Sequence, residues 1–463
     1  MPSLPEPYRP ILGEISHLLR LAVPVVLTQI GAMALTMVDV IMVGHVGADV
    51  LAAASLGSVW MMGTLIIGMG VILGLDPVIT QAHGARDREI LGLSLQRGIV
   101  VALGLSLPLA CLWLATEPVM LLARQEPRLA AMAHDYVVVQ IPSIPAYLSF
   151  LAQRQYLQGR GIVKPAMWIT LGANGLNVLF NWGLIFGNLG MPALGLVGAG
   201  LATCMTRVFL ALGLAAWMIA GRLHEGAWVA WSRKALDRAP LGALLALGLP
   251  IGFQLGLDVW AFEIVTLLAG QFDTASLAAH SIVLNLVALA FMIPLGISSA
   301  AVTRVGNLIG RGDARNARQA TWIAIALGAA MMAACALAFI VFRHRIPLFY
   351  TGDARVIEVA GGLLIIAAMF QLFDGIQVVA GGILRAMKRT KTAAWFNLIG
   401  YYGLGLPLAI ALAFGLDLRV EGLWYGLSAA LAIIAASLTV WLWQHGPGVR
   451  LDTTPAAPVA GEP

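Results

Sequence analysis

Residues 21–53 read LAVPVVLTQIGAMALTMVDVIMVGHVGADVLAA, and residues 247–279 read LGLPIGFQLGLDVWAFEIVTLLAGQFDTASLAA. Matching residues stand 226 positions apart in the pairs Leu21/Leu247, Pro24/Pro250, Gly44/Gly270, Leu51/Leu277, Gly84/Gly310 and Asp87/Asp313. Farther along, the offset becomes 227 in the pairs Leu157/Leu384, Lys164/Lys391, Ala166/Ala393 and Trp168/Trp395. The chain therefore consists of two equal halves, a pattern that in an apolar chain is typical of carriers with a binding site between the halves.

The composition excludes an ordinary soluble protein. Of the 463 residues, 60% are hydrophobic and 11% are charged, whereas soluble domains carry about 25% charged residues. Twelve apolar stretches reach the roughly 20 residues that cross a bilayer, and in lipid such stretches must be helical. They are residues 16–43, 51–80, 95–116, 133–157, 165–187, 195–221, 241–270, 277–303, 319–342, 356–384, 393–414 and 422–444. The sequence predicts an all-α polytopic membrane protein with two pseudo-symmetric six-helix bundles.

The basic residues indicate orientation in the membrane and not a nucleic-acid partner. If the amino terminus is inside, the outside loops hold only Arg124, Arg128, Arg343, Arg345, Arg355 and Arg419. An excess of Lys and Arg in the remaining loops marks the cytoplasmic side, so both termini are expected there. Lys is rare while Ala, Gly and Leu are abundant, which favours a high-GC bacterium and its inner membrane.

The repeat sets the predicted domain boundaries. Residues 1–15 form a cytoplasmic amino terminus, 16–221 the first bundle, 222–240 a cytoplasmic linker, 241–445 the second bundle and 446–463 a disordered tail. Six spans in each half give both halves the same orientation, which predicts a symmetry axis along the membrane normal. Gly248, Gly252 and Gly256 follow G-x-x-x-G spacing, which predicts close helix packing.

Charged residues are few within the predicted spans, and those that could carry chemistry are Asp39, Asp76, Asp258, Glu263, Asp374 and Arg207. A charged side chain at mid-bilayer costs about 2.5–3.5 kcal/mol, so each of them should face a cavity or a partner. Asp39, Glu263 and Asp374 are expected in the outer half of a central cleft, where a carboxylate can hold H⁺, Na⁺ or a cationic substrate. The alternative is that each acid caps a loop or pairs with a neighbour, with Arg207 as an internal counter-ion.

Amide and aromatic side chains lie on the same predicted helices. Asn174, Asn177 and Asn181 form one helical stripe, and such amides either coordinate a cation or join helices by hydrogen bonds. Gln254 and Asn285 admit the same two interpretations. Aromatic rings could receive a flat organic cation or merely pack, and those in question are Trp260, Phe262, Phe291, Phe370, Phe373 and Trp395.

Several kinds of chemistry are excluded by missing motifs. No Lys follows a Gly, so the chain has no phosphate-binding loop of the Walker A type, and it has neither H-E-x-x-H nor G-x-S-x-G. Cys111, Cys204 and Cys335 all fall within spans, which argues against disulfides and metal clusters. We therefore expect that the protein is not an enzyme, carries no cofactor and draws its energy from an ion gradient or from a partner chain. We also expect a monomer.

A set of motifs runs in order along most of the chain. It comprises P-x-x-x-x-Q at 24–29, MVDVIMVGHVGADVLAAASL at 37–56, QAHGA at 81–85, LQGRG at 157–161, LAAHSIVLNLVALAFMIPLGISSAAVTRVGNLIGRGD at 277–313 and ILRAMKRTKTAAW at 383–395. In these motifs the chain resembles the multidrug and toxic compound extrusion (MATE) transporters, in their NorM-like bacterial branch. The resemblance covers residues 15–445 and implies two six-helix bundles around a central cavity.

The resemblance also implies a function, namely export of cationic amphiphilic compounds in exchange for Na⁺ or H⁺. Glu263 and Asp374 match the family's acidic pair for the coupling cation, and Asp39 matches the acid of the first span. Some relatives carry an acid where this chain has Asn181, which favours the second bundle for coupling. Asp258 and the amide and aromatic side chains named above, Phe291 and Phe370 among them, would then shape the substrate cavity.

Three other functions remain open at this point. A lipid-linked oligosaccharide flippase of the same superfamily would need a basic cavity, and the predicted interior offers only Arg207. An intramembrane enzyme would need a nucleophile with a base, or a metal site, where the spans offer scattered acids. A passive channel is disfavoured by the duplicated halves.

Overall fold

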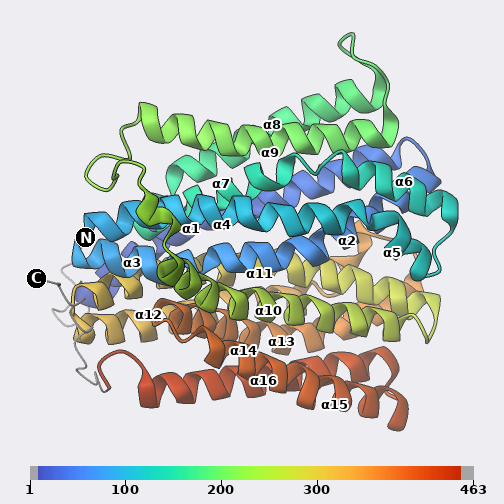
Figure 1. Ribbon diagram of the computed structural model, residues 1–463. Coiled ribbons are helices and arrows are strands. Elements are labelled where there is room, and N and C mark those ends of the chain that lie inside the picture. Colours follow the sequence, from blue (N-terminus) through green and yellow to red (C-terminus); the bar gives the residue numbers. More distant parts are fainter. Residues whose placement is uncertain (1–8, 450–463) are drawn as a thin grey trace, which may run out of the picture. The chain divides into compact units, whose positions relative to one another are not determined.

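The computed structural model describes residues 9–449, and every regular element in that range is helical (Figure 1). The α-helices are α1 (Arg9–Gly44), α2 (Ala48–Leu73), α3 (Leu75–Ala85), α4 (Arg88–Leu114), α5 (Thr116–Leu122), α6 (Pro127–Val138), α7 (Ser143–Gly159), α8 (Lys164–Phe186), α9 (Gly195–Ala220), α10 (Arg238–Ala269), α11 (Thr274–Gly310), α12 (Ala314–Phe342), α13 (Ala354–Ala386), α14 (Thr390–Leu398), α15 (Leu406–Ile410) and α16 (Arg419–His445). Short 3₁₀ segments lie at Arg233–Leu236 (η2) and Pro347–Phe349 (η3), and π-helical segments at Ile399–Gly405 (η4) and Ala411–Gly415 (η5). Residues 1–8 of the predicted amino terminus and 450–463 of the predicted tail lie outside the described range.

The predicted spans correspond closely to these helices. Within residues 9–449, 11 helical segments are long and apolar enough to cross a membrane by length and composition. The predicted span 133–157 is the exception, because it is divided into α6 and α7 at residues 139–142. Pro142 explains the break, since proline cannot donate the helical hydrogen bond and its ring clashes with the preceding turn. The hydroxyl of Ser143 donates to the carbonyl of Gln140 at 2.6 Å and completes the turn.

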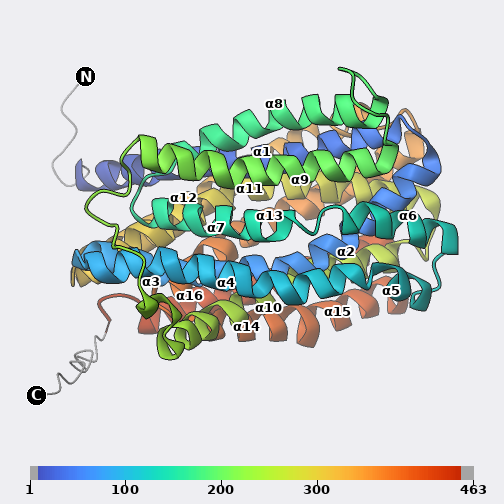
Figure 2. The ribbon, with the colours of Figure 1, turned by 45° about the horizontal axis from the view of Figure 1, so that its top comes forward.

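The chain forms two compact units that do not coincide with the sequence repeats. Within residues 9–449, the first unit is Arg20–Ile264, and the second unit joins residues 9–19 with residues 265–449. In the first unit α3, α4 and α7 pack side by side, as both views show (Figures 1 and 2). In the second unit α13 packs against α11, α12 and α16. The start of α10, which belongs to the second sequence repeat, therefore lies in the first unit.

Glycines explain why α10 joins that unit. A Cβ built on Gly74 would lie 2.8 Å from the Cα of Gly248, and one built on Gly252 would lie 2.7 Å from the carbonyl oxygen of Ile67. Gly70 faces Gly252 at a similarly close approach. The backbones of α2 and α10 therefore touch directly, the arrangement expected for small residues at this spacing. Gly256 takes no part, since its Cβ would meet only the Trp260 ring at 3.8 Å.

Aspartates at helix starts account for part of the sequence repeat. Asp87 caps α4 by accepting from the backbone N–H of Ile90 at 2.9 Å, and Asp313 caps α12 by accepting from that of Asn316. These two aspartates are the repeat-related pair at offset 226. Their matched positions in the two halves thus reflect an N-terminal cap, which satisfies an otherwise unpaired backbone donor.

Asp273 caps α11 and also lies in an ion pair. Its Oδ1 accepts from the backbone N–H of Ser276 at 2.7 Å, and its Oδ2 lies 2.7 Å from Nη2 of Arg419. The Ser276 backbone N–H, and after it the charges of Arg419 and Arg355, hold the pKa of Asp273 below its ordinary value. The carboxylate therefore remains ionised in mildly acidic solution.

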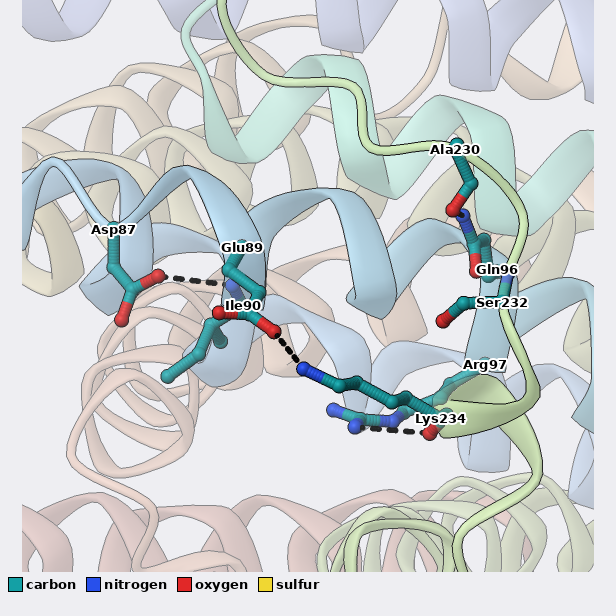
Figure 3. A network of polar contacts seen from close by, with 8 residues as sticks. All are labelled: Asp87, Glu89, Ile90, Gln96, Arg97, Ala230, Ser232 and Lys234. Carbon is teal, nitrogen blue, oxygen red and sulfur yellow. Dashed lines mark hydrogen bonds and ion pairs between the residues drawn. The ribbon is translucent and has the colours of Figure 1, made fainter. Parts of the chain in front are cut away.

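The connection between the repeats is fixed to the first unit (Figure 3). The buried side chain of Gln96 on α4 donates to the carbonyls of Val229 at 2.9 Å and Ala230 at 3.2 Å. Lys234 Nζ lies 2.7 Å from Oε1 of Glu89, also on α4. Because these contacts hold residues 229–234 against α4, the predicted linker 222–240 is an ordered part of the unit formed by Arg20–Ile264.

Candidate ion and substrate sites

Asp39 lies at the centre of a polar cluster in the first unit. Its Oδ1 accepts from Nδ2 of Asn177 at 3.1 Å and from Nδ2 of Asn181 at 2.6 Å, while its Oδ2 accepts from the hydroxyl of Thr203 at 2.8 Å. Asn181 Nδ2 also lies 3.2 Å from Asn177 Oδ1. These side chains come from α1, α8 and α9. Three donors converge on one carboxylate, and each of these hydrogen bonds stabilises the ionised form of Asp39.

The predicted asparagine stripe is only partly directed at Asp39. Asn177 and Asn181 are both buried in contact with the acid. Asn174, one turn earlier, donates instead to the carbonyl of Thr170 at 2.9 Å within its own helix. Its Nδ2 lies beside Gly31 of α1, where an added Cβ would come within 3.3 Å. The stripe therefore joins α8 to α1 along its length and meets the carboxylate only at its far end.

Two arginines belong to the interior of the same unit. Arg207 donates to the hydroxyl of Ser143 at 3.2 Å, and its guanidinium lies over the ring of Tyr147 at 5.2 Å. Among the ion pairs of the described residues, none joins Arg207 to an acid within 4.0 Å, although its charge acts on Asp39 at longer range. Arg154, a charged residue within a predicted span that the sequence reasoning overlooked, lies in α7 and donates to Gln29 at 3.1 Å.

Asp374 in the second unit has very different surroundings. It is buried within α13, and its Oδ2 has no hydrogen-bond partner in the structure. Gln371, one turn earlier on the same helix, is fully buried, and neither its amide oxygen nor its amide nitrogen has a partner. Residues three apart on a helix lie on one face, with Cβ atoms about 5–6 Å apart. A carboxylate and a carboxamide therefore lie on the same face of α13, and both have buried polar atoms without a hydrogen-bond partner.

The next polar side chain on that face of α13 is paired. Gln377 donates from Nε2 to Oδ1 of Asn397 on α14 at 2.9 Å, and both residues are buried. Phe370, predicted to line a cavity, is also buried and packs edge-on against Trp424 with ring centroids 5.8 Å apart. The structure therefore places Phe370 in the packed interior of its unit.

The other predicted site residues lie at more accessible positions. Glu263 and Asn285 are exposed, whereas Asp258, Gln254 and Phe291 are half-buried. Asn285 donates to the carbonyl of Ser281 within its own helix. Glu263 belongs to the unit Arg20–Ile264 and Asp374 to the other, so their joint action on a cation stays a prediction.

Sequence reasoning missed Thr203, Gln371 and His280. None of them belongs to a run of identical polar side chains at helical spacing, which is the signal that revealed the asparagine stripe. The one available signal for Gln371 was its spacing of three residues from Asp374. No group of three or more His, Cys, Asp or Glu residues suited to a metal ion occurs within residues 9–449.

These features define a class, a polytopic helical membrane protein with isolated acids among apolar helices, and comparison with known proteins identifies the family. The MatE family model matches residues 24–183 and 250–411, so the chain belongs to this family. The fold class and the resemblance expected from the sequence are thereby confirmed.

Curated relatives cover nearly the whole chain. A probable multidrug resistance protein NorM of Mesorhizobium japonicum is 36% identical over 93% of this chain and 94% of its own length. The multidrug and toxin extrusion protein 2 of Mus musculus is 33% identical over 93% of this chain and 74% of its own. The chain is therefore a multidrug efflux transporter of the MATE family and not an enzyme.

Solved structures agree in fold. The eukaryotic MATE transporter AtDTX14 superposes with a TM-score of 0.85 at 23% identity, covering 94% of this chain and 96% of that one. The Vibrio cholerae MATE transporter VcmN in its bent form superposes with a TM-score of 0.83 at 20% identity, covering 94% and 97%. At these identities the agreement concerns the arrangement of helices, which is that of a multi-pass membrane transporter.

Proposed function

We propose that the protein exports cationic amphiphilic compounds across the bacterial inner membrane in exchange for Na⁺ or H⁺, by alternating access. Glu263 and Asp374 bind the coupling cation, and its arrival weakens the hold on the substrate. Both termini are cytoplasmic, and the transporter acts as a monomer without a cofactor. The basic inside loops and the NorM-type bacterial relatives support this placement.

The observation that carries the proposal is the buried carboxylate oxygen of Asp374 that has no hydrogen-bond partner. A buried polar atom left without a hydrogen bond costs about 1–3 kcal/mol, and more when it is charged. Asp374 Oδ2 and both amide atoms of Gln371 are such atoms, on one face of α13. A proton on the carboxyl group, or Na⁺ held by carboxylate and carboxamide oxygens, would remove that cost. The site thus favours an occupant of positive charge.

The surroundings of Asp39 differ from those of Asp374, and the difference favours Asp374 for cation coupling. Its carboxylate already accepts three hydrogen bonds, so binding a cation there brings a smaller gain. Asp39 is better suited to attract a cationic substrate, together with Asp258 and the half-buried side chains of Gln254 and Phe291. Asn174, Asn177 and Asn181 would hold α8 against α1 beside that substrate.

The available energy suffices for concentrative export. One elementary charge that crosses about 130 mV releases about 3 kcal/mol, which supports a gradient of roughly a hundredfold. A chain without a nucleotide-binding loop draws on such a gradient or on a partner chain, and we propose the gradient.

The test is export of a fluorescent organic cation from proteoliposomes in which Na⁺ and pH gradients are imposed separately. We expect Asp374→Asn and Glu263→Gln to abolish gradient-driven export while the purified variants remain folded. The matched control is Asp49→Asn. Asp49 forms an ion pair with Arg128 at 3.5 Å in which both side chains are exposed, so this variant removes a carboxylate outside the proposed site. Export at the wild-type rate by the double variant of Asp374 and Glu263 would refute the proposal.

A further inference from the structure

A single histidine ring joins three helices in the interior of the second unit. His280 on α11 is fully buried, and both of its ring nitrogens have a neighbour. Trp424 on α16 donates from Nε1 to Nδ1 of His280 at 3.1 Å. Nε2 lies 2.9 Å from the hydroxyl oxygen of Thr266 on α10. A ring held from two sides in this way has a defined orientation.

The hydrogen bonds also define which nitrogen of His280 carries the proton. An indole N–H can only donate, so Nδ1 must be the acceptor, and the neutral ring carries its hydrogen on Nε2. The Nε2–H therefore donates to Thr266. A protonated ring would direct a second N–H at the indole N–H, which is a donor facing a donor. In this arrangement His280 stays neutral, so it does not carry the coupling proton, although histidine is often chosen for that role.

The chain of contacts ends beside the candidate cation site. Trp424 packs edge-on against His280 on one side, with centroids 5.7 Å apart, and against Phe370 on the other. Phe370 precedes Asp374 by one helical turn on α13, and Thr266 follows Glu263 by three residues on α10. The contacts from Thr266 through His280 and Trp424 to Phe370 thus connect the α13 segment that carries Asp374 to α11, α16 and α10.

We propose that His280, with Thr266 and Trp424, is a positioning element that fixes Asp374 in the geometry required by the coupling cation. This inference rests on the proposed function, because it assumes that Asp374 binds that cation. Loss of either hydrogen bond leaves a buried ring nitrogen or N–H unpaired and allows α13 to shift against α11 and α16. The affinity for the cation should fall, whereas the affinity for the exported compound should not.

The experiment uses variants that remove one hydrogen-bonding group at a time. Thr266→Val removes the hydroxyl at nearly constant volume, and Thr266→Ser retains it. Trp424→Phe keeps an aromatic ring but removes the N–H, and His280→Asn keeps an acceptor for Trp424 while it loses the donor to Thr266. For each full-length variant we would measure the Na⁺ or H⁺ concentration for half-maximal export, the dissociation constant of a fluorescent organic cation, and thermal stability in detergent.

We expect Thr266→Val and Trp424→Phe to raise the half-maximal cation concentration about tenfold, as for one unpaired buried group. The dissociation constant of the organic cation should stay within about twofold, and Thr266→Ser should behave as wild type. Equal behaviour of Thr266→Val and Thr266→Ser would overturn the inference, and so would a loss of thermal stability without a change in cation dependence. Failure of the proposed function is recognised separately, because Asp374→Asn would then export normally.

Discussion

Replacement of Gly252 by Ala is expected to force α10 away from α2. The added Cβ would lie 2.7 Å from the carbonyl oxygen of Ile67, whereas ordinary contact begins at 3.4 Å. The obstacle is a backbone atom in the middle of a helix, so no side-chain rotation relieves the contact. One of the two helices must move by several tenths of an ångström, which loosens the packing around it.

The free-energy cost of this close contact can be separated from other effects of the substitution by a matched control on the same helix. Gly256 lies one turn after Gly252, and its added Cβ meets only the Trp260 ring at 3.8 Å. Replacing Gly by Ala within a helix stabilises the folded state by about 0.5–1 kcal/mol. This effect is common to both variants and cancels when their free energies of unfolding are compared. The difference that remains is the cost of overpacking, about 1–3 kcal/mol.

The measurement is the free energy of unfolding in detergent, followed by tryptophan fluorescence, for Gly252→Ala and Gly256→Ala. A second pair gives an independent comparison, since Gly74 at the end of α2 faces Gly248 closely, while a Cβ added to Gly63 within α2 would meet open space. We expect Gly252→Ala and Gly74→Ala to be the less stable member of each pair. If the members of each pair agree within about 0.5 kcal/mol, the argument from close backbone approach is refuted.

Three further predictions concern ion pairs, hydrogen bonds and pH. Arg304 and Glu14 form a two-pronged ion pair at 2.7 Å with side chains 22% and 13% exposed, so Arg304→Gln should cost about 3–5 kcal/mol of unfolding free energy. The double variant Glu14→Gln/Arg304→Gln should recover most of that loss. Thr203→Val removes one of three donors to Asp39 and should cost about 1.5–3 kcal/mol, while Thr203→Ser should not. Asp273→Ala should cost about 1 kcal/mol at neutral pH. Because the folded-state pKa of Asp273 is lowered, that contribution exists above the unfolded value of about 3.9 and is lost as the pH falls through the folded value.

Each of these predictions has a contradicting outcome. The prediction for Arg304 and Glu14 is contradicted if the double variant loses as much unfolding free energy as the two single variants together. For Thr203 the contradicting outcome is equal stability of the Val and Ser variants. The prediction for Asp273 is contradicted if the difference in unfolding free energy between wild type and Asp273→Ala stays constant from pH 7 down through the folded-state pKa of the Asp273 carboxyl group.

The helices could be predicted from the sequence because bilayer crossing requires long apolar runs, and these are visible without any structure. The break at Pro142 was less visible, since proline also occurs within continuous helices of this chain, as at Pro24 and Pro250. Whether a proline bends or ends a helix depends on the neighbouring helices that accept the freed backbone groups. The G-x-x-x-G spacing in α10 likewise predicted a close helix contact, but the sequence did not indicate that α2 is the helix contacted.

The acids were predictable because charged residues are rare within apolar spans, whereas their uncharged polar partners were predictable only where such residues recur with the helical period. Asn177 and Asn181 were found as a stripe, and the structure brings both to Asp39. Thr203 on α9 supplies the third donor, but a lone hydroxyl in an apolar helix commonly bonds its own helix, so its partner could not be inferred from its position alone. The unpaired state of Gln371 is likewise a property of its surroundings and leaves no mark on the sequence.

The duplication makes the two halves alike in span pattern but not in chemistry. At the offset of 227, Asp374 corresponds to Tyr147 and Gln371 to Ile144. In the other direction, at 226, Asp39 corresponds to Val265. Each of these two acids therefore corresponds to an uncharged residue in the other half, and neither site is a copy of the other.

The donors around the first acid show the same divergence. Asn177, Asn181 and Thr203, which bond Asp39, correspond at the offset of 227 to Leu404, Leu408 and Ala430. Three donors stabilise the anionic form of a carboxylate, and a buried carboxylate without them depends more strongly on a cation or a proton. If the halves performed equivalent steps, equivalent surroundings would be expected at both acids. Their divergence favours a division of labour, in which Asp39 and Asp374 cannot replace each other, so introducing a carboxylate at position 265 should not rescue a transporter that lacks Asp374.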